Sequence, residues 1–546
     1  MMRSPMFRKL ALAFSVANLC FFMAWRDVLS PQAIAYLYLW KQNPGFASLL
    51  ALLINVLALT AVFYLGFSLA WRRAGPFLQN CLRLAFLVIF FRSLNGVRIQ
   101  FHSLSTGHLR LVFGRVGFFA LGMSLLAMLI LIIARYGIVS VTRVAAGVAL
   151  ILSPLGLVAA TQGTVQVIKY NVLVSQERQA TPLIPASVNP GPRVLWVIFD
   201  EMSSELAFGR RPPELELPEF DRFQDVALSA ANAYPPARRT MQSIPALLTG
   251  QLVAATKPAG PDELLLTFAG QSEPVGWSQQ QDIFSAARAI RLNTAVVGWY
   301  HPYCRVIGDR LTRCFWQPAS QLTNPEKFGV ARMMLVQDAD ALQLLPFTGR
   351  VREWILNKTP DYRTPHLGDY LELVDRAAQL AADPDVKLAF VHLPVPHPPY
   401  IYDRHRGVWD TKGELSYLDN LALADRALGQ LRTAMERTGI WDTTTVVISS
   451  DHWWRTEYWD IRKPIWSPAD NPYRGEGTDH RIPFLIKLEG QKTGSRYEPP
   501  FNTVLTHDLI LDVLNRKVSS AEQVTAWLDT HRTIGESPFQ AYDDSP

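Results

Sequence analysis

The sequence has little charge and few cysteines for its length. Of its 546 residues, 18% are charged, four are cysteines and 49% are hydrophobic. It contains no cluster of basic residues interleaved with aromatic ones, which argues against a nucleic-acid partner. It also lacks internal repeats and low-complexity tracts, which argues against a repeat architecture. The length and composition together predict two or three domains, with a membrane part joined to a soluble part.

Long apolar runs occupy residues 1–165 and predict a helical membrane domain. The runs at 45–71 and 116–134 are each long enough to cross about 30 Å of hydrocarbon. The run at 77–91 is interrupted by Asn80 and Arg83, and it is included because five spans place the chain ends on opposite sides. About five transmembrane helices are therefore expected, at residues 10–25, 45–71, 77–91, 116–134 and 144–160.

Basic residues predict the orientation of these helices. Arg3, Arg8 and Lys9 precede the first run, as in a signal peptide, but no small-residue cleavage site follows. We therefore expect an uncleaved anchor with a cytoplasmic N-terminus. Four arginines would fall on the opposite side, against this bias: Arg92, Arg98, Arg110 and Arg115. The prediction is a multi-pass protein of the inner (cytoplasmic) membrane, with its soluble part on the periplasmic or extracellular side.

The soluble part follows a proline-rich linker at residues 166–192. Short apolar strands then alternate with helical patterns over residues 193–530, and residues 531–546 form a tail. This alternation predicts an α/β/α sandwich with a mostly parallel sheet. Strands are expected at residues 194–199, 294–299, 386–392, 443–448 and 484–488. Helices are expected at residues 282–291, 370–382 and 415–438.

The four cysteines fall into two groups. Cys20 and Cys81 lie in apolar runs, where we expect small buried or lipid-facing side chains. Cys304 and Cys314 lie close together in the soluble part. If that part is outside the cytoplasm, a disulfide between them is expected.

Carboxylate and imidazole side chains follow two of the predicted strands. Asp200 and Glu201 end the first strand, and Asp451 and His452 come just after the strand at 443–448. Open α/β sheets place their sites at such strand ends. Oxygen and nitrogen ligands of this kind suit zinc or another divalent ion. The alternative is that each pair only caps its strand.

Further histidines flank two other strands. His397 follows the strand at 386–392, and His480 precedes the strand at 484–488. Either one alone is better explained as structural, but several histidines and carboxylates at one rim favour a functional site. Tyr300, His301 and Tyr400 are weaker candidates, and packing explains each of them better than substrate contact.

Thr240 is the candidate nucleophile. It lies in residues 234–250, where a loop turns into a helix, and a hydroxyl at a helix N-terminus has the positive dipole end beside it. A coordinated divalent ion would favour its alkoxide. The alternative is that Thr240 is simply the N-cap of the helix.

Together these motifs resemble the alkaline phosphatase superfamily over about residues 190–515, in particular its membrane-bound phosphoethanolamine and phosphoglycerol transferases. The resemblance implies that Thr240 is a nucleophile that also binds metal, and that His397 and His480 bind the substrate phosphate or a second metal. The metal ligands that it implies are Asp200, with Glu201 as a second candidate, Asp451 and His452. The chain departs from these transferases in carrying an aspartate as first ligand and one expected disulfide.

Sulfatases form another branch of the same superfamily, and their nucleophile is a cysteine or serine converted to formylglycine. Counting nine residues back from Thr249-Gly250, as in sulfatases, lands on Thr240. The sulfatase proline and arginine positions are occupied here by Gln242 and Ile244. Threonine has a secondary alcohol and cannot give the aldehyde, so a direct threonine nucleophile is expected.

The resemblance implies a metal-dependent transferase with one or two divalent ions, zinc being the first choice. It would move phosphoethanolamine, or another substituted phosphoryl group, from a phospholipid donor to an envelope glycan or lipid acceptor through a phospho-threonine intermediate. Two alternatives stay open: a sulfatase-like hydrolase of phosphodiesters or sulfate esters with the same fold, and a non-catalytic membrane scaffold.

Overall fold

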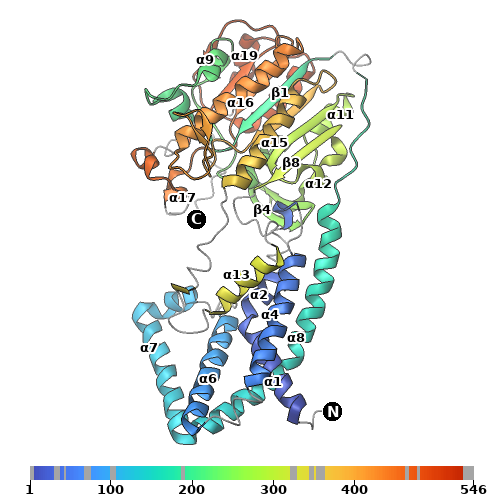
Figure 1. Cartoon of the computed structure of the whole chain (residues 1–546). Coiled ribbons are helices and arrows are strands. Elements are labelled where there is room, and N and C mark those ends of the chain that lie inside the picture. The colour runs from blue at the N-terminus through green and yellow to red at the C-terminus, as the bar shows by residue number, and fades with distance from the viewer. Residues whose placement is uncertain are drawn as a thin grey trace. The chain divides into compact units, whose positions relative to one another are not determined.

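A computed structural model of the chain gives its architecture (Figure 1). It describes residues 5–29, 37–41, 45–66, 75–98, 106–185, 191–319, 329–342, 350–351, 363–460, 466–475 and 480–532. Arg3, which contributes to the predicted orientation, lies outside these residues, as does most of the predicted tail. By internal packing the chain divides into a helical unit (1–33, 42–172 and 324–360) and a second unit (34–41, 173–323 and 361–546). The second is called the catalytic unit because it contains every predicted site residue.

The helical unit confirms the expected series of apolar helices. Among the described residues, four helices are long and apolar enough to cross a membrane, or five if the pair α1 and α2, bent by 67°, is one span. The interrupted run at 77–91 lies within α6, which begins at Pro76. The helices of this series are α1 (Pro5–Cys20), α2 (Phe22–Leu29), α4 (Gly45–Leu65), α6 (Pro76–Arg98), α7 (Thr106–Tyr136) and α8 (Ile138–Ser175).

The unit boundaries differ from the predicted domain limits in three ways. Helix α8 continues to Ser175, through the first part of the predicted linker at 166–192. Residues 34–41, from the predicted membrane domain, belong to the catalytic unit. Residues 324–360, from the predicted catalytic domain, belong to the helical unit.

Helix α13 (Val330–Leu342) explains the last difference. It packs on α4 through buried polar contacts. The amide of Asn55 donates to the carbonyl of Met334 at 3.1 Å and to the side-chain oxygen of Gln337 at 3.2 Å. Gln337 in turn donates to the carbonyl of Ser48 at 2.9 Å. Such pairs satisfy polar groups that apolar surroundings would otherwise leave unpaired.

The catalytic unit is built on an eight-stranded sheet with the order β14-β2-β13-β12-β1-β9-β7-β8. The five central and edge strands on one side of β13 run parallel to one another. They are β12 (Thr444–Ser449), β1 (Arg193–Phe199), β9 (Leu388–Leu393), β7 (Thr294–Tyr300) and β8 (Arg313–Pro318). Beyond them, β13 (Phe484–Lys487) is antiparallel to both β12 and β2 (Leu228–Ala230), and β14 (Ser495–Tyr497) is parallel to β2.

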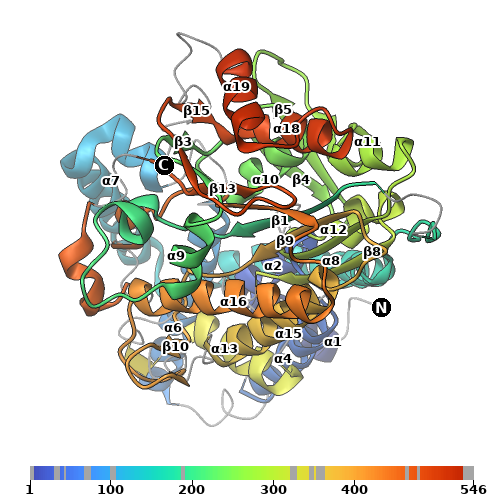
Figure 2. The ribbon, with the colours of Figure 1, turned by 90° about the horizontal axis from the view of Figure 1, so that it is seen from above.

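Helices cover both faces of this sheet, as Figure 2 shows from above. On one face lie α9 (Pro218–Gln224), α15 (Arg363–Ala381) and α16 (Tyr417–Arg437). On the other lie α10 (Thr240–Thr249), α11 (Ile283–Ala289), α18 (Thr506–Leu514) and α19 (Ala521–His531). All seven residues of β1 are buried, because alternate side chains enter the cores on opposite faces. The expected α/β/α architecture with a mostly parallel sheet is confirmed.

The predicted disulfide is also confirmed. Cys304, on the short helix α12 (Tyr303–Val306), is bonded to Cys314 on β8. It ties the chain that leaves β7 back to the neighbouring strand. A disulfide in this unit is what a non-reducing compartment would allow.

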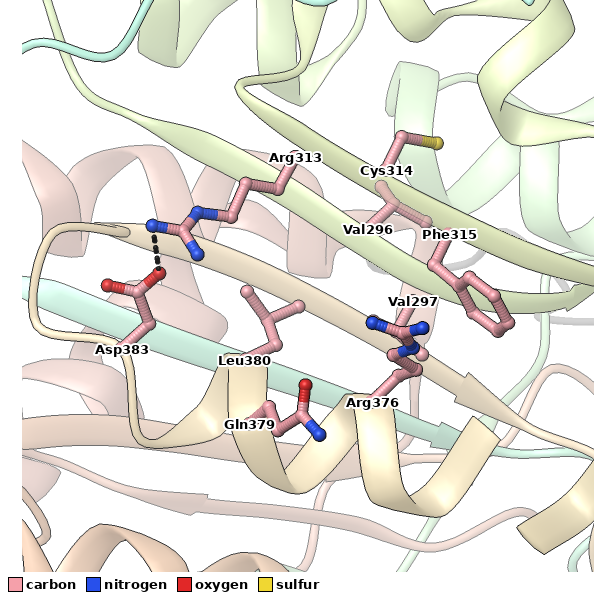
Figure 3. A pocket seen from close by; sticks show the side chains of 9 residues that line it. All are labelled: Val296, Val297, Arg313, Cys314, Phe315, Arg376, Gln379, Leu380 and Asp383. Atoms are coloured by element: carbon pink, nitrogen blue, oxygen red, sulfur yellow. Dashed lines mark ion pairs between the residues drawn. The ribbon is translucent and has the colours of Figure 1, made fainter. Parts of the chain in front are cut away.

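A pocket of about 270 Å³ lies beside β7, β8 and α15 (Figure 3). Arg313 forms an ion pair with Asp383 at 3.0 Å, and the guanidinium of Arg376 lies 5.3 Å from the centre of the Phe315 ring. None of the predicted site residues lines it.

Candidate active site

The site is built where β1, β12 and β9 end side by side. Asp200 follows β1 directly, and Asp451 comes two residues after the end of β12. In the register of β1 with β9, Ile198 lies opposite His392. Because the three strands are parallel, their ends deliver these side chains to one rim of the sheet. Asp200, Asp451 and His392 are all fully buried.

Thr240 is the first residue of α10, and its hydroxyl turns toward this rim. The O–H of Thr240 donates to Oδ2 of Asp200 at 3.3 Å, and Oγ1 lies 3.2 Å from Nε2 of His452. The N-cap is Arg239, whose side chain makes no capping hydrogen bond. The N-cap alternative for Thr240 is therefore wrong. A second hydrogen bond holds α10 at this rim, in which the hydroxyl of Ser243 donates to the carbonyl of Asp451.

Asp200, Asp451 and His452 offer ligand atoms that all lie within 4.8 Å of one another. The Nδ1–H of His452 donates to the carbonyl of Trp453 at 3.0 Å, and burial lowers the pKa of His452 well below its usual value. The ring is therefore neutral, and its Nε2 lone pair faces Oδ2 of Asp451 at 3.4 Å. A lone pair facing a carboxylate oxygen is repulsive unless a cation lies between them.

The carboxylates of Asp200 and Asp451 also indicate that a positive charge is missing from this site. Within the described residues, neither Oδ1 of Asp200 nor Oδ2 of Asp451 has a hydrogen-bond partner, although both atoms are buried. Burial raises the pKa of Asp200 well above its usual range, and the charge of Glu201 adds to the rise. Burial and the charge of Asp200 raise the pKa of Asp451 to about 7. A divalent cation would satisfy these atoms, so the residues present fit the predicted metal.

Glu201 is placed differently from the other predicted ligands. Its carboxylate accepts hydrogen bonds from the backbone N–H and the Nε–H of Arg455, each at 3.1 Å, and from Trp459 at 2.8 Å. Its Oε2 also lies 3.7 Å from Nε2 of His397, and these two residues form a second ligand group with Asp200. Because Arg455 already neutralises its charge, Glu201 is the predicted ligand least suited to a metal.

The two predicted substrate histidines occupy different places. His397 reaches the second ligand group, where its Nδ1–H donates to the carbonyl of Pro398 and its ring packs against Trp299 and Trp459. His480 stacks on Trp453, with ring centroids 4.0 Å apart, next in sequence to His452. The structure brings His397 to the carboxylates and places His480 against Trp453.

His392 and Arg455 are site residues that were not singled out from the sequence. Nε2 of His392 lies 3.2 Å from Oδ2 of Asp200, and its Nδ1 lies 3.0 Å from the hydroxyl of Tyr303. The available signal was a histidine inside an otherwise apolar strand that is buried on both faces. Arg455 follows Asp451 by four residues, but only the fold shows that it pairs with Glu201.

The three weaker candidates have distinct positions. His301 is fully buried, and its Nε2 lies 3.0 Å from the carbonyl oxygen of Thr240. Tyr300 has a left-handed backbone with φ of 75° and packs on Trp299. Tyr400 is buried and interacts with Asp470. Of these, His301 contacts Thr240, the predicted nucleophile, directly.

Replacing Arg455 by methionine is expected to destabilise the catalytic unit by about 3–5 kcal/mol, because it leaves the Glu201 carboxylate buried without a counter-charge. The double variant Glu201→Gln/Arg455→Met should recover much of this loss. Arg496→Met, which removes an exposed pair with Glu498, is the control and should cost less than about 1 kcal/mol. Thermal unfolding of the purified chain measures all three. Equal losses of stability in Arg455→Met and Arg496→Met would contradict the assignment of Arg455 as the counter-charge of Glu201.

A family model described as Sulfatase matches residues 192–516, a range that contains every predicted site residue. The search of curated proteins gave no match. Among solved structures, a sulfatase from Pseudoalteromonas sp. is 15% identical with a TM-score of 0.41, over 62% of this chain and 74% of that one. The phosphonate monoester hydrolase of Agrobacterium radiobacter is 12% identical with a TM-score of 0.37, over 59% and 74%. An alkaline phosphatase superfamily protein from Vibrio parahaemolyticus is 13% identical with a TM-score of 0.35, over 59% and 66%.

Proposed function

Because the chain belongs to the sulfatase family of the alkaline phosphatase superfamily, we propose that it is a membrane-anchored, metal-dependent transferase of a substituted phosphoryl group. The donor is a phospholipid, with phosphatidylethanolamine as the first choice, and the acceptor is a glycan or lipid of the cell envelope. The apolar helices and the Cys304–Cys314 disulfide support an inner-membrane protein whose catalytic unit lies outside the cytoplasm.

One observation carries the choice of phosphoryl transfer. The hydroxyl between Asp200 and His452 belongs to a threonine, which can attack phosphorus directly but cannot become formylglycine. Its position at the first turn of α10 adds the positive end of a helix dipole, which favours a developing negative charge. A divalent ion bound by Asp200, Asp451 and His452 would lower the pKa of this hydroxyl and offset charge on the phosphoryl group.

The reaction divides into two balanced displacements. In the first, Oγ1 of Thr240 forms a bond to the donor phosphorus, the bond to the diacylglycerol oxygen breaks, and the threonine proton ends on that oxygen. In the second, an acceptor hydroxyl displaces Oγ1, and its proton returns to Thr240. The product is the acceptor carrying the head-group phosphate.

The residues of the second ligand group have complementary roles. Burial lowers the pKa of His397 to about 3, and its Nδ1–H is used by Pro398, so Nε2 offers a lone pair. A ring with so low a pKa is a weak base, so this lone pair suits a second metal ion better than proton transfer. Arg455 contacts Glu201 through Nε and would offer its terminal nitrogens to a phosphoryl oxygen. His480, which stacks on Trp453, would also contact the substrate.

The second candidate is a hydrolase of phosphodiesters or sulfate esters, and the family match itself favours it. The two candidates differ in what resolves the intermediate. A purified chain given fluorescent phosphatidylethanolamine without an acceptor should release about one diacylglycerol per protein and then stall if it is a transferase. Adding an envelope lipid extract should restore turnover. Steady release of diacylglycerol without the extract would indicate hydrolysis. Turnover of p-nitrophenyl sulfate alone would indicate a sulfatase.

A further inference from the structure

A short segment between α2 and α4 in the sequence forms part of the catalytic unit. It contains the turn Leu37–Leu39, and Tyr38 within it is fully buried. The guanidinium of Arg305 holds the segment by donating to the carbonyls of Tyr38 at 3.2 Å and Trp40 at 2.6 Å. The ammonium of Lys41 lies 4.8 Å from the centre of the Phe315 ring. The segment is therefore built into the core of this unit.

A chain of hydrogen bonds leads from Tyr38 to the nucleophile residue. The hydroxyl of Tyr38 lies 3.0 Å from Nδ1 of His301, and Nε2 of His301 lies 3.0 Å from the carbonyl oxygen of Thr240. A carbonyl oxygen only accepts, so Nε2 must carry the hydrogen. His301 is fully buried and its described ring contacts are aromatic side chains rather than carboxylates, so the ring is neutral and Nδ1 accepts. The O–H of Tyr38 is then the donor that satisfies Nδ1 and holds the ring in place.

We propose that Tyr38 is a positioning residue for the reaction of Thr240. By donating to Nδ1 of His301, it holds the ring in place and keeps the Nε2–H aimed at the first carbonyl of α10. That bond holds the first turn of the helix, and with it the Thr240 hydroxyl, against Asp200 and His452. The inference rests on the proposed function, because it assumes that Thr240 is the nucleophile.

The proposal has a consequence for how the enzyme is organised. Tyr38 lies in the sequence between two apolar helices, far from the rest of the catalytic unit. A catalytic domain that begins after α8 lacks this residue. The nucleophile would then depend on a segment supplied by the N-terminal part of the chain, and excision of the soluble part would remove it.

The test is Tyr38→Phe in the full-length chain, which removes the hydroxyl and keeps the ring. We expect kcat for phosphatidylethanolamine to fall about tenfold with KM nearly unchanged, because a misplaced nucleophile affects the chemical step. Tyr497→Phe is the matched control. It removes another buried tyrosine hydroxyl, which donates to Asp529 at 2.9 Å, and should keep the wild-type kcat.

His301→Gln provides the conservative background. A glutamine amide carries its own fixed donor, so it needs no partner to orient a hydrogen toward the carbonyl of Thr240. Removing the Tyr38 hydroxyl in this background should change kcat less than about twofold, which would show coupling between the two positions. Equal effects in the wild-type and His301→Gln backgrounds would overturn the proposal, as would a Tyr38→Phe variant with wild-type kcat.

A readout without catalysis separates this inference from the proposed function. In the full chain with ¹⁵N-labelled histidine, the signal of the unprotonated Nδ1 of one neutral histidine should shift on Tyr38→Phe, because this nitrogen loses its hydrogen-bond donor. If the wild type turns over no donor but this change occurs, the proposed function fails and the positioning contact stands. If the signal is unchanged, the positioning role of Tyr38 is wrong.

Discussion

Thr240→Ala is expected to stop turnover of a phosphodiester donor, with rates on the order of 10³-fold or more below wild type. The variant removes the oxygen that lies between Asp200 and His452. The nearest hydroxyl on the same helix turn cannot replace it, because Ser243 donates to the carbonyl of Asp451. Release of fluorescent diacylglycerol from phosphatidylethanolamine measures the effect.

Two controls make this result specific. Thr240→Ser keeps a hydroxyl at the same position and should retain activity within about tenfold of wild type. Thr249→Ala removes a buried hydroxyl from the other end of α10, where it donates to the carbonyl of Pro245, and should leave activity unchanged. Wild-type diacylglycerol release by Thr240→Ala would contradict the assignment of the nucleophile.

Asp451→Asn is expected to remove the bound divalent metal, with affinity falling at least about 100-fold. Its Oδ2 is one of the buried oxygens without a partner among the described residues, and an amide there replaces a full negative charge by a dipole. The same change lowers the repulsion between Asp451 and Asp200. The variant should therefore fold, contain little metal and be inactive.

Metal analysis and unfolding measurements distinguish loss of metal from loss of fold. Metal should stabilise the wild-type chain by about 3–4 kcal/mol at 100 to 1,000 times its dissociation constant, and a chelator should remove this gain. Neither metal nor chelator should change the stability of Asp451→Asn. Asp470→Asn is the matched control, since Asp470 is also a fully buried aspartate with an unpartnered Oδ2 among the described residues, but belongs to neither ligand group. Unchanged metal content in Asp451→Asn would count against the site.

The rim of the site could be predicted because its residues follow buried strands. Asp200 comes directly after a run of apolar residues and Asp451 follows another by two serines, and parallel strands bring their ends together. Thr240 could be placed because a loop turns into a helix at that position. The apolar runs could likewise be assigned to helices from length and composition alone. These features depend on local pattern.

The parts that could not be predicted depend on contacts between distant segments. Tyr38 lies in a short stretch between two apolar runs, and nothing local indicates that it is buried beside His301. Residues 330–342 fall within the predicted soluble part, but they form helix α13, whose contact with Asn55 is visible only in the fold. The sequence groups Glu201 with the metal ligands because it follows Asp200, whereas its carboxylate is paired with Arg455.

The most direct measurement of the central claim is mass spectrometry of the Thr240 peptide after a short reaction with phosphatidylethanolamine and no acceptor. The account predicts that Thr240 carries the head-group phosphate in an amount equal to the diacylglycerol released, and that envelope lipid extract removes it. Release of diacylglycerol with Thr240 unmodified, or with the phosphate on another residue, would contradict the account.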